Sequence, residues 1–172
     1  MDSPSSDTCI RQGVDLDIFL RAQNSRWDTA LDEIKNGRKE SHWIWFIWPQ
    51  LSRLGSSLMS RIWAIPSLEA AREYLSHEVL GARLHEITEA ALNWDSQGQD
   101  IESLMGSETD KLKLQSCMTL FMRASDKEDT VFKKVLDKYY EGKPDAATDD
   151  RLAKLCGNTA NDALPEELED TA

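Results

Sequence analysis

Residues 41–50 read SHWIWFIWPQ and include the longest uninterrupted apolar run of the chain, Trp43 to Trp48. The run holds three of the six tryptophans and ends at Pro49. It is too apolar for a test of periodicity and is rich in β-branched and aromatic residues. It therefore predicts either a short buried strand or an inward-facing helical turn. We expect most of these large side chains to lie in the core.

Both flanks of this run have the period of amphipathic helices. Eight helical segments are predicted, at roughly residues 15–23, 27–37, 68–76, 79–94, 101–105, 110–125, 131–140 and 148–155. Ser25 and Asp28 form a predicted capping box, and Thr148 is a predicted N-cap. The fold class is therefore mainly α, a single compact helical domain of about six to eight helices. Minor strand is expected at most near 44–47 and 62–65.

The segment 110–125 predicts a helix with one apolar face. At about 100° per residue, an arc of about 120° holds Leu114, Cys117, Met118, Phe121 and Ala124. Ser116, Thr119 and Arg123 lie on the opposite side, and Lys113 is at the border. We expect a helix that packs on the core and has a polar back.

A chain of 172 residues is long enough for one domain of ordinary size. The net charge is -11, but residues 18–144 carry only -2 of it, whereas 1–17 carry -3 and 145–172 carry -6. We expect a disordered N-terminal tail at 1–13, a helical domain at 14–156 and an acidic, mostly disordered C-terminal tail at 157–172. Leu164 and Leu168 in that tail are spaced for a frayed helical turn.

The composition argues against several classes of function. An excess of 31 acidic over 20 basic residues disfavours duplex nucleic acid and anionic membranes as partners. The N-terminus lacks the basic and apolar regions of a signal peptide, which predicts a cytoplasmic protein with access to the nucleus. The histidines and cysteines lack zinc-site spacing, and the sequence has no P-loop, G-x-G-x-x-G or EF-hand loop, so no metal and no cofactor is predicted.

Polar residues beside the apolar run and on the helix at 110–123 are the predicted site. His42 is the candidate acid or base because imidazole titrates near neutrality. The predicted ligand-binding residues are Arg38, Lys39, Ser41, Trp43, Gln50, Lys113 and Ser116. Each also has a structural interpretation, such as a hydrogen-bonded core histidine, a tryptophan packed in the core, a lysine that extends to solvent, or cations that offset a helix dipole.

Four blocks of the chain resemble the family called domain of unknown function 1810. They are SHWIWFIWPQ, LGSS at 54–57, AIPSLEAAREYLSHEVLGARL at 64–84 and DKLKLQSCMTLF at 110–121. The resemblance covers about residues 15–142 and implies a small, mainly helical domain without an assigned activity. Cys117 departs from the family pattern, which usually has a small hydroxyl residue there. Some members carry the label calpastatin, which fits poorly because calpain inhibitors of that name are disordered repeat proteins.

Two functional hypotheses follow from these residues. The first is an aromatic-lined, partly basic pocket for a nucleotide-like or ribosyl-containing small molecule, with hydrolysis assisted by His42; the glycosidic chemistry is an analogy. The second is a non-enzymatic interaction module that presents an aromatic patch to a protein partner. A closed concavity would favour the first, exposed tryptophans would favour the second, and a Trp-rich block that is only core would favour neither.

Overall fold

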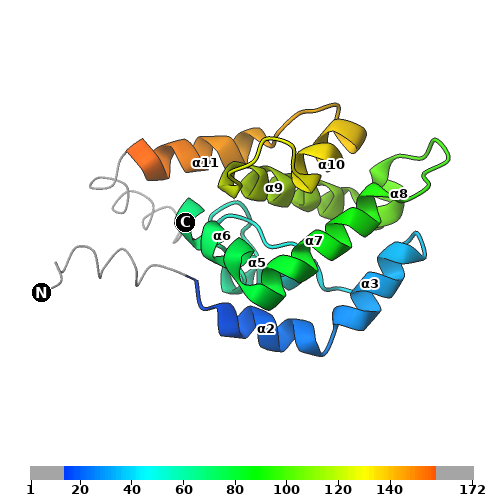
Figure 1. The fold of residues 1–172 in the computed structure, drawn as a ribbon, viewed down its shortest axis with the longest axis horizontal. Coiled ribbons are helices and arrows are strands. Elements are labelled where there is room, and N and C mark those ends of the chain that lie inside the picture. The colour runs from blue at the N-terminus through cyan, green and yellow to red at the C-terminus, as the bar shows by residue number, and fades with distance from the viewer. Residues whose placement is uncertain (1–13, 158–172) are drawn as a thin grey trace, which may run out of the picture.

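The computed structural model describes residues 14–157 of the chain (Figure 1). Within that range it contains ten α-helices. They are α2 (Leu16–Asn24), α3 (Trp27–Lys35), α4 (Ile44–Ile47), α5 (Leu58–Ile62), α6 (Leu68–Ser76), α7 (Glu78–Leu92), α8 (Ile101–Met105), α9 (Glu108–Ala124), α10 (Val131–Tyr139) and α11 (Ala146–Gly157). The mainly α fold predicted from periodicity is confirmed. The predicted tail at 1–13, and residues 158–172 of the predicted C-terminal tail, lie outside the described residues.

Two of the ten helices, α4 and α5, lie in segments that periodicity left open. Trp43 to Trp48 forms a helical turn, closed by a hydrogen bond of 2.9 Å from the Trp48 N–H to the Ile44 carbonyl. The strand considered near 44–47 is therefore wrong. Near 62–65, only Ile65 is extended, in an isolated parallel bridge with Leu51. The backbone N–H and C=O groups of a buried strand must be hydrogen-bonded to neighbouring strands. Within residues 14–157, the bridge between Leu51 and Ile65 is the one pairing of this kind, so no strand forms there.

Two predicted caps are also corrected. The Ser25 hydroxyl donates back to the Ala22 carbonyl at 3.2 Å, and α3 begins after Arg26 without a side-chain cap, so no capping box forms. Thr148 lies inside α11, where its N–H and hydroxyl both donate to the Asp145 carboxylate at 3.0 and 2.5 Å. Asp145 therefore holds the N-terminus of α11, which starts earlier than the sequence predicts.

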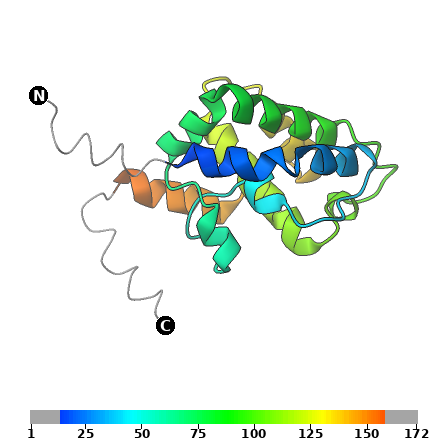
Figure 2. The same cartoon turned by 90° about the horizontal axis from the view of Figure 1, so that it is seen from below.

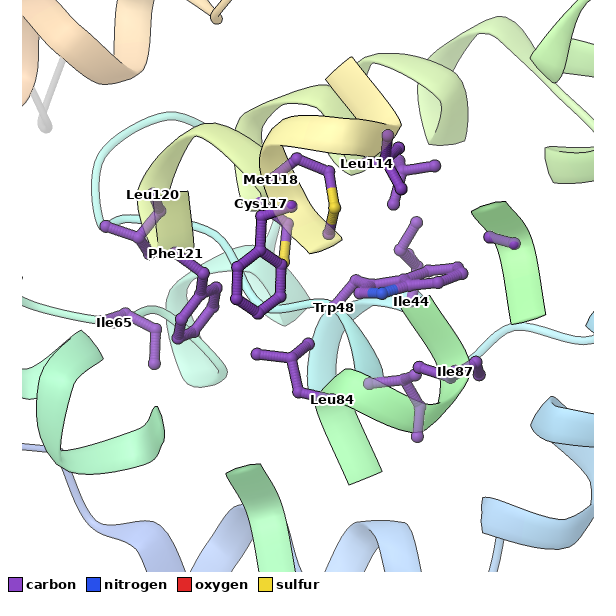
Figure 3. Close-up of a cluster of buried hydrophobic side chains, with 14 of the residues drawn as sticks. Ile44, Trp48, Ile65, Leu84, Ile87, Leu114, Cys117, Met118, Leu120 and Phe121 are labelled. Atoms are coloured by element: carbon purple, nitrogen blue, oxygen red, sulfur yellow. The ribbon is translucent and has the colours of Figure 1, made fainter. Parts of the chain in front are cut away.

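Two long helices organise the domain. α7 packs against α2, α3, α6 and α10, and α9 packs against α6, α8, α10 and α11. Figure 1 shows α2 and α3 on one side of α7, with α9, α10 and α11 on the other. The apolar run lies between these groups. In Figure 3, Ile44 and Trp48 lie between Leu84 and Ile87 of α7 and the apolar face of α9, which confirms that the run belongs to the core.

Two of the three residues predicted for the polar back of α9 do not face water, and Arg123 is the exposed one. Ser116 and Thr119 are buried, because α11 packs over this side of α9. Thr119 Oγ1 accepts from the Asp145 N–H at 2.8 Å, and the Arg123 guanidinium makes two hydrogen bonds of 3.0 and 2.9 Å to the Asp149 carboxylate. The polar back is thus an interface between two helices of the same domain.

Candidate functional site

The segment that holds the predicted site is fixed by the carboxylate of Glu33 on α3. Glu33 Oε1 accepts from the backbone N–H groups of Glu40 and Ser41 at 2.8 and 2.9 Å. The Ser41 hydroxyl donates to Oε2 at 2.6 Å, and the Trp43 indole donates to Oε1 at 2.9 Å. One carboxylate therefore satisfies four donors and sets the conformation of residues 40–43.

This arrangement lowers the pKa of Glu33. Partial burial alone would raise the pKa, but the hydrogen bonds from Ser41, Glu40 and Trp43 outweigh it and lower the pKa from 4.5 to about 2. The depressed value in the folded state means that Glu33 contributes stability above pH 4.5, and that this contribution is lost as the pH falls from about 4.5 to about 2.

Glu33→Gln is therefore expected to flatten the acid limb of the stability profile. The amide cannot accept all four hydrogen bonds as an anion does, so the variant is destabilised at pH 7 and loses less stability between pH 5 and about 2.5. Urea unfolding at several pH values measures this. Asp32→Asn, an exposed neighbour on the same helix, is the control and is expected to keep the wild-type slope. An unchanged acid limb in Glu33→Gln would contradict the assignment.

Lys39 is a buried cation that ties the same segment to α9. Its ammonium lies 2.7 Å from Asp110 Oδ2 and donates to the Ser41 carbonyl at 2.7 Å. It also lies 4.9 Å from the centre of the Trp43 ring. The Lys39 side chain is 4% exposed and the Asp110 side chain 17% exposed. Asp110 therefore neutralises the charge of Lys39, whose N–H groups are occupied by contacts within the protein, as is typical of a structural lysine.

The structure does bring the two predicted blocks together, at Lys39 with Asp110 and at Lys113 with Trp45. The Lys113 ammonium lies 5.3 Å from the centre of the Trp45 ring. The indole N–H of Trp45 is buried without a hydrogen-bond partner in the described part of the chain. An unmet donor of this kind costs about 1–3 kcal/mol, so this contact is the part of the predicted site with spare binding capacity.

The other predicted residues are scattered around this contact. Trp43 is fully buried and held by Glu33, whereas Arg38 and His42 are exposed and Gln50 is half-buried. Ser116 faces away from them, with its hydroxyl 3.0 Å from Asp145 Oδ2 under α11. A role of these residues in ligand binding stays a prediction, with Lys39, Ser41, Trp43 and Ser116 already engaged in internal contacts.

The structure shows a surface pocket elsewhere, which sequence reasoning missed. It has a volume of about 390 Å³ and lies between the end of α6, the middle of α7 and the segment that joins α9 to α10. We call it the His85 pocket. It is lined by Arg72, Leu75, Ser76, His85, Ala124, Ser125, Asp126, Lys127 and Thr130. The lining includes two cations, one carboxylate and one imidazole, and the Arg72 guanidinium also lies 3.0 Å from the Glu69 carboxylate.

His85 is the most versatile group of this pocket. Its Nδ1 lies 2.9 Å from the Gly81 carbonyl, an acceptor, so Nδ1 carries a proton and donates. Its ring lies against Phe132, with centroids 5.2 Å apart. With Nδ1 engaged in this way, Nε2 is the nitrogen left to contact a ligand, as an acceptor when neutral and as a donor when protonated.

The pocket depends on a close approach between α6 and α7. A Cβ atom on Gly81 would lie 2.1 Å from the carbonyl oxygen of Leu75, so only glycine allows the two backbones to touch here. This contact places Leu75 and Ser76 beside the turn of α7 that bears His85. A glycine inside a helical pattern is the sequence signal that could have pointed to this place.

Residues 14–157 contain neither a cluster of metal-ligating side chains nor a membrane-spanning helix. No group of three or more His, Cys, Asp or Glu side chains in that range is arranged to hold a metal ion. None of the described helices is both long enough and apolar enough to span a membrane.

The fold and the pocket define a small, all-helical domain with polar residues gathered at a surface concavity. The chain belongs to the family described as Protein of unknown function (DUF1810), whose profile matches residues 13–152. It is similar to the conserved hypothetical protein Rv1873 from Mycobacterium tuberculosis, with 45% identity and a TM-score of 0.76 over 81% of this chain and 96% of that chain. No curated protein matches it. The resemblance drawn from the sequence blocks is confirmed, and neither description carries an activity.

Proposed function

We propose that this domain binds a small anionic molecule in the His85 pocket. The observation that carries the proposal is the pocket of about 390 Å³ lined by Arg72, Lys127 and His85. Sites for small molecules are typically concave and about 300–1,000 Å³ in volume, with a few convergent polar groups. The pocket falls in that range, and its cations are suited to a phosphate or carboxylate group.

The ligand class that we infer is nucleotide-like or a ribosyl phosphate. Ser76, Ser125 and Thr130 line the pocket beside the cations. The Ser125 hydroxyl donates to the Phe121 carbonyl and keeps its lone pairs, and the Thr130 hydroxyl accepts from the Lys133 N–H and keeps its proton, so both can still bond to a sugar hydroxyl. The imidazole of His85 can accept from a sugar hydroxyl or donate to a phosphate oxygen. This keeps the class of ligand inferred from the sequence but moves its site away from residues 38–50.

The alternative hypothesis, a module that presents an aromatic patch to a protein partner, requires exposed aromatic side chains. Within the described part of the chain, the exposed large apolar side chains are Leu58, Ile62 and Leu112, and no tryptophan is among them. The exposed large apolar residues that a protein partner could contact there are therefore aliphatic.

The test is a thermal-shift titration with orthophosphate, ribose 5-phosphate and nucleoside monophosphates. A ligand at about 100 times its dissociation constant adds about 2.7 kcal/mol to the free energy of unfolding, which moves the midpoint by about 5–10 °C. We expect one of these probes to produce such a shift, His85→Gln to remove most of it and Lys127→Gln to reduce it.

His42→Gln is the matched control, because His42 is an exposed histidine outside the pocket. It is expected to keep the full shift. A shift that is lost in His42→Gln and kept in His85→Gln would overturn the assignment and place the ligand at residues 38–50. The absence of a shift with all three classes of probe would overturn the proposed ligand class.

A further inference from the structure

The short helix α5 presents an apolar face to solvent. Leu58 is 70% exposed and Ile62 is 46% exposed, and none of the five residues of the helix is buried. The two side chains are four residues apart, so they lie on the same face of the helix. Figure 2 shows α5, in teal, projecting from the body of the domain. An exposed pair of this kind on a helix with no buried side suggests a surface that another segment covers.

The surroundings of α5 have an unusual charge for this chain. Residues 41–68 contain no aspartate or glutamate, although the chain as a whole has a net charge of -11. The charged residues of that stretch are Arg53 and Arg61, apart from His42. Arg61 is exposed and lies on α5 itself, between Leu58 and Ile62 in sequence. The exposed side chains of α5 are therefore aliphatic and basic, which favours an acidic partner that carries aliphatic residues.

One segment of this chain has the complementary composition. Residues 158–172 hold five acidic residues and no lysine or arginine. Leu164 and Leu168 lie among these acids, with the same spacing as Leu58 and Ile62. Charge and apolar spacing thus match between the two segments.

The chain that follows α11 acts as a tether between the acidic segment and the domain that carries α5. Leu164 and Leu168 follow the end of α11 by seven and eleven residues, which span up to about 25 and 40 Å when extended, whereas a domain of this size has a radius of gyration of about 15 Å. Residues 158–172 follow directly on α11, and the chain up to Leu164 is longer than the radius of gyration of the domain. A tether also raises the local concentration of the segment to the millimolar range, so a weak contact suffices for docking.

We infer that residues 158–172 dock on α5, with Leu164 and Leu168 against Leu58 and Ile62, and with the acidic side chains beside Arg61. This inference rests on α5 and is independent of the His85 pocket. The docked segment would shield Leu58 and Ile62 from water, and the charges of Arg61 and of the acidic side chains would partly neutralise each other.

Hydrogen exchange of the full-length protein, followed by mass spectrometry, tests the inference. Amide hydrogens between residues 162 and 170 are expected to exchange more slowly than in an unstructured peptide of the same sequence, by a factor of about five or more. The protection is expected to fall in the double variant Leu58→Ser/Ile62→Ser and in Arg61→Glu. It is also expected to fall as the salt concentration rises, because part of the attraction is between exposed charges.

Leu112→Ser is the matched control, because Leu112 is the third exposed large apolar residue within 14–157 and lies on α9. It is expected to leave the protection unchanged. Exchange at the unstructured rate in the wild type would overturn the inference, and so would equal loss of protection in Leu112→Ser. Protection of α5 that depends on protein concentration and persists in Leu164→Ser/Leu168→Ser would overturn it in favour of a second copy of the chain.

Discussion

Gly81→Ala is expected to lower the free energy of unfolding by about 1–2 kcal/mol. The added Cβ would lie 2.1 Å from the Leu75 carbonyl oxygen and 3.0 Å from its carbon, and both are backbone atoms that cannot rotate away. The helices α6 and α7 would have to separate, and overpacking of this kind typically costs about 1–3 kcal/mol or more. The gain of about 1 kcal/mol that alanine brings to a helix interior offsets only part of this cost. Urea unfolding, monitored by circular dichroism, measures the change.

Ala82→Gly separates packing from helix propensity. Ala82 is exposed on the same helix, so its replacement is expected to cost only the propensity difference of about 1 kcal/mol. If the contact with Leu75 did not limit packing, Gly81→Ala would stabilise the protein by a similar amount, and that result would contradict the prediction. Because the contact also shapes the His85 pocket, Gly81→Ala is expected to weaken the thermal shift produced by a pocket ligand, whereas Ala82→Gly leaves it intact.

Asp110→Ala is expected to destabilise the protein by about 3 kcal/mol. The substitution removes the carboxylate that lies 2.7 Å from the Lys39 ammonium, and the lysine side chain is only 4% exposed. Removing one partner of a buried ion pair typically costs about 3–5 kcal/mol, because the remaining charge is left uncompensated away from water. The Ser41 carbonyl and the Trp43 ring still contact the ammonium, which places the expected loss at the lower end of that range.

An exposed ion pair of the same chain provides the comparison. Lys133 and Asp137 on α10 lie 2.9 Å apart but are 48% and 51% exposed, so Asp137→Ala is expected to cost about 0.5 kcal/mol or less. The double variant Lys39→Met/Asp110→Ala is expected to be more stable than Asp110→Ala alone, since it removes the stranded charge. Equal losses in Asp110→Ala and Asp137→Ala would show that the Lys39 pair is effectively solvated.

The sequence was informative where the physical signal is local. Helical periodicity predicted the eight segments that became α2, α3 and α6 to α11, and the density of large apolar residues predicted that most of the run from Trp43 to Trp48 lies in the core. Periodicity could not decide between strand and helix at 43–48, because a run in which every residue is apolar has no period. It also could not show that α11 covers the polar back of α9, since Ser116 and Thr119 look solvated until Asp145 supplies their partner.

The candidate sites show the same contrast between what local sequence determines and what tertiary contacts determine. Sequence alone determined that the domain is helical, that an aromatic block forms its core, that its acidity lies mainly at the ends and that it belongs among the relatives named above. Only the tertiary structure decided that Lys39 is buried against Asp110 and that Arg72, His85 and Lys127 line one pocket. The reason is that helix periodicity is written within a few consecutive turns, whereas a pocket depends on how distant helices cross. That crossing is set by backbone contacts such as the one at Gly81, where a glycine in the helix marks a close approach but does not identify Leu75 as its partner.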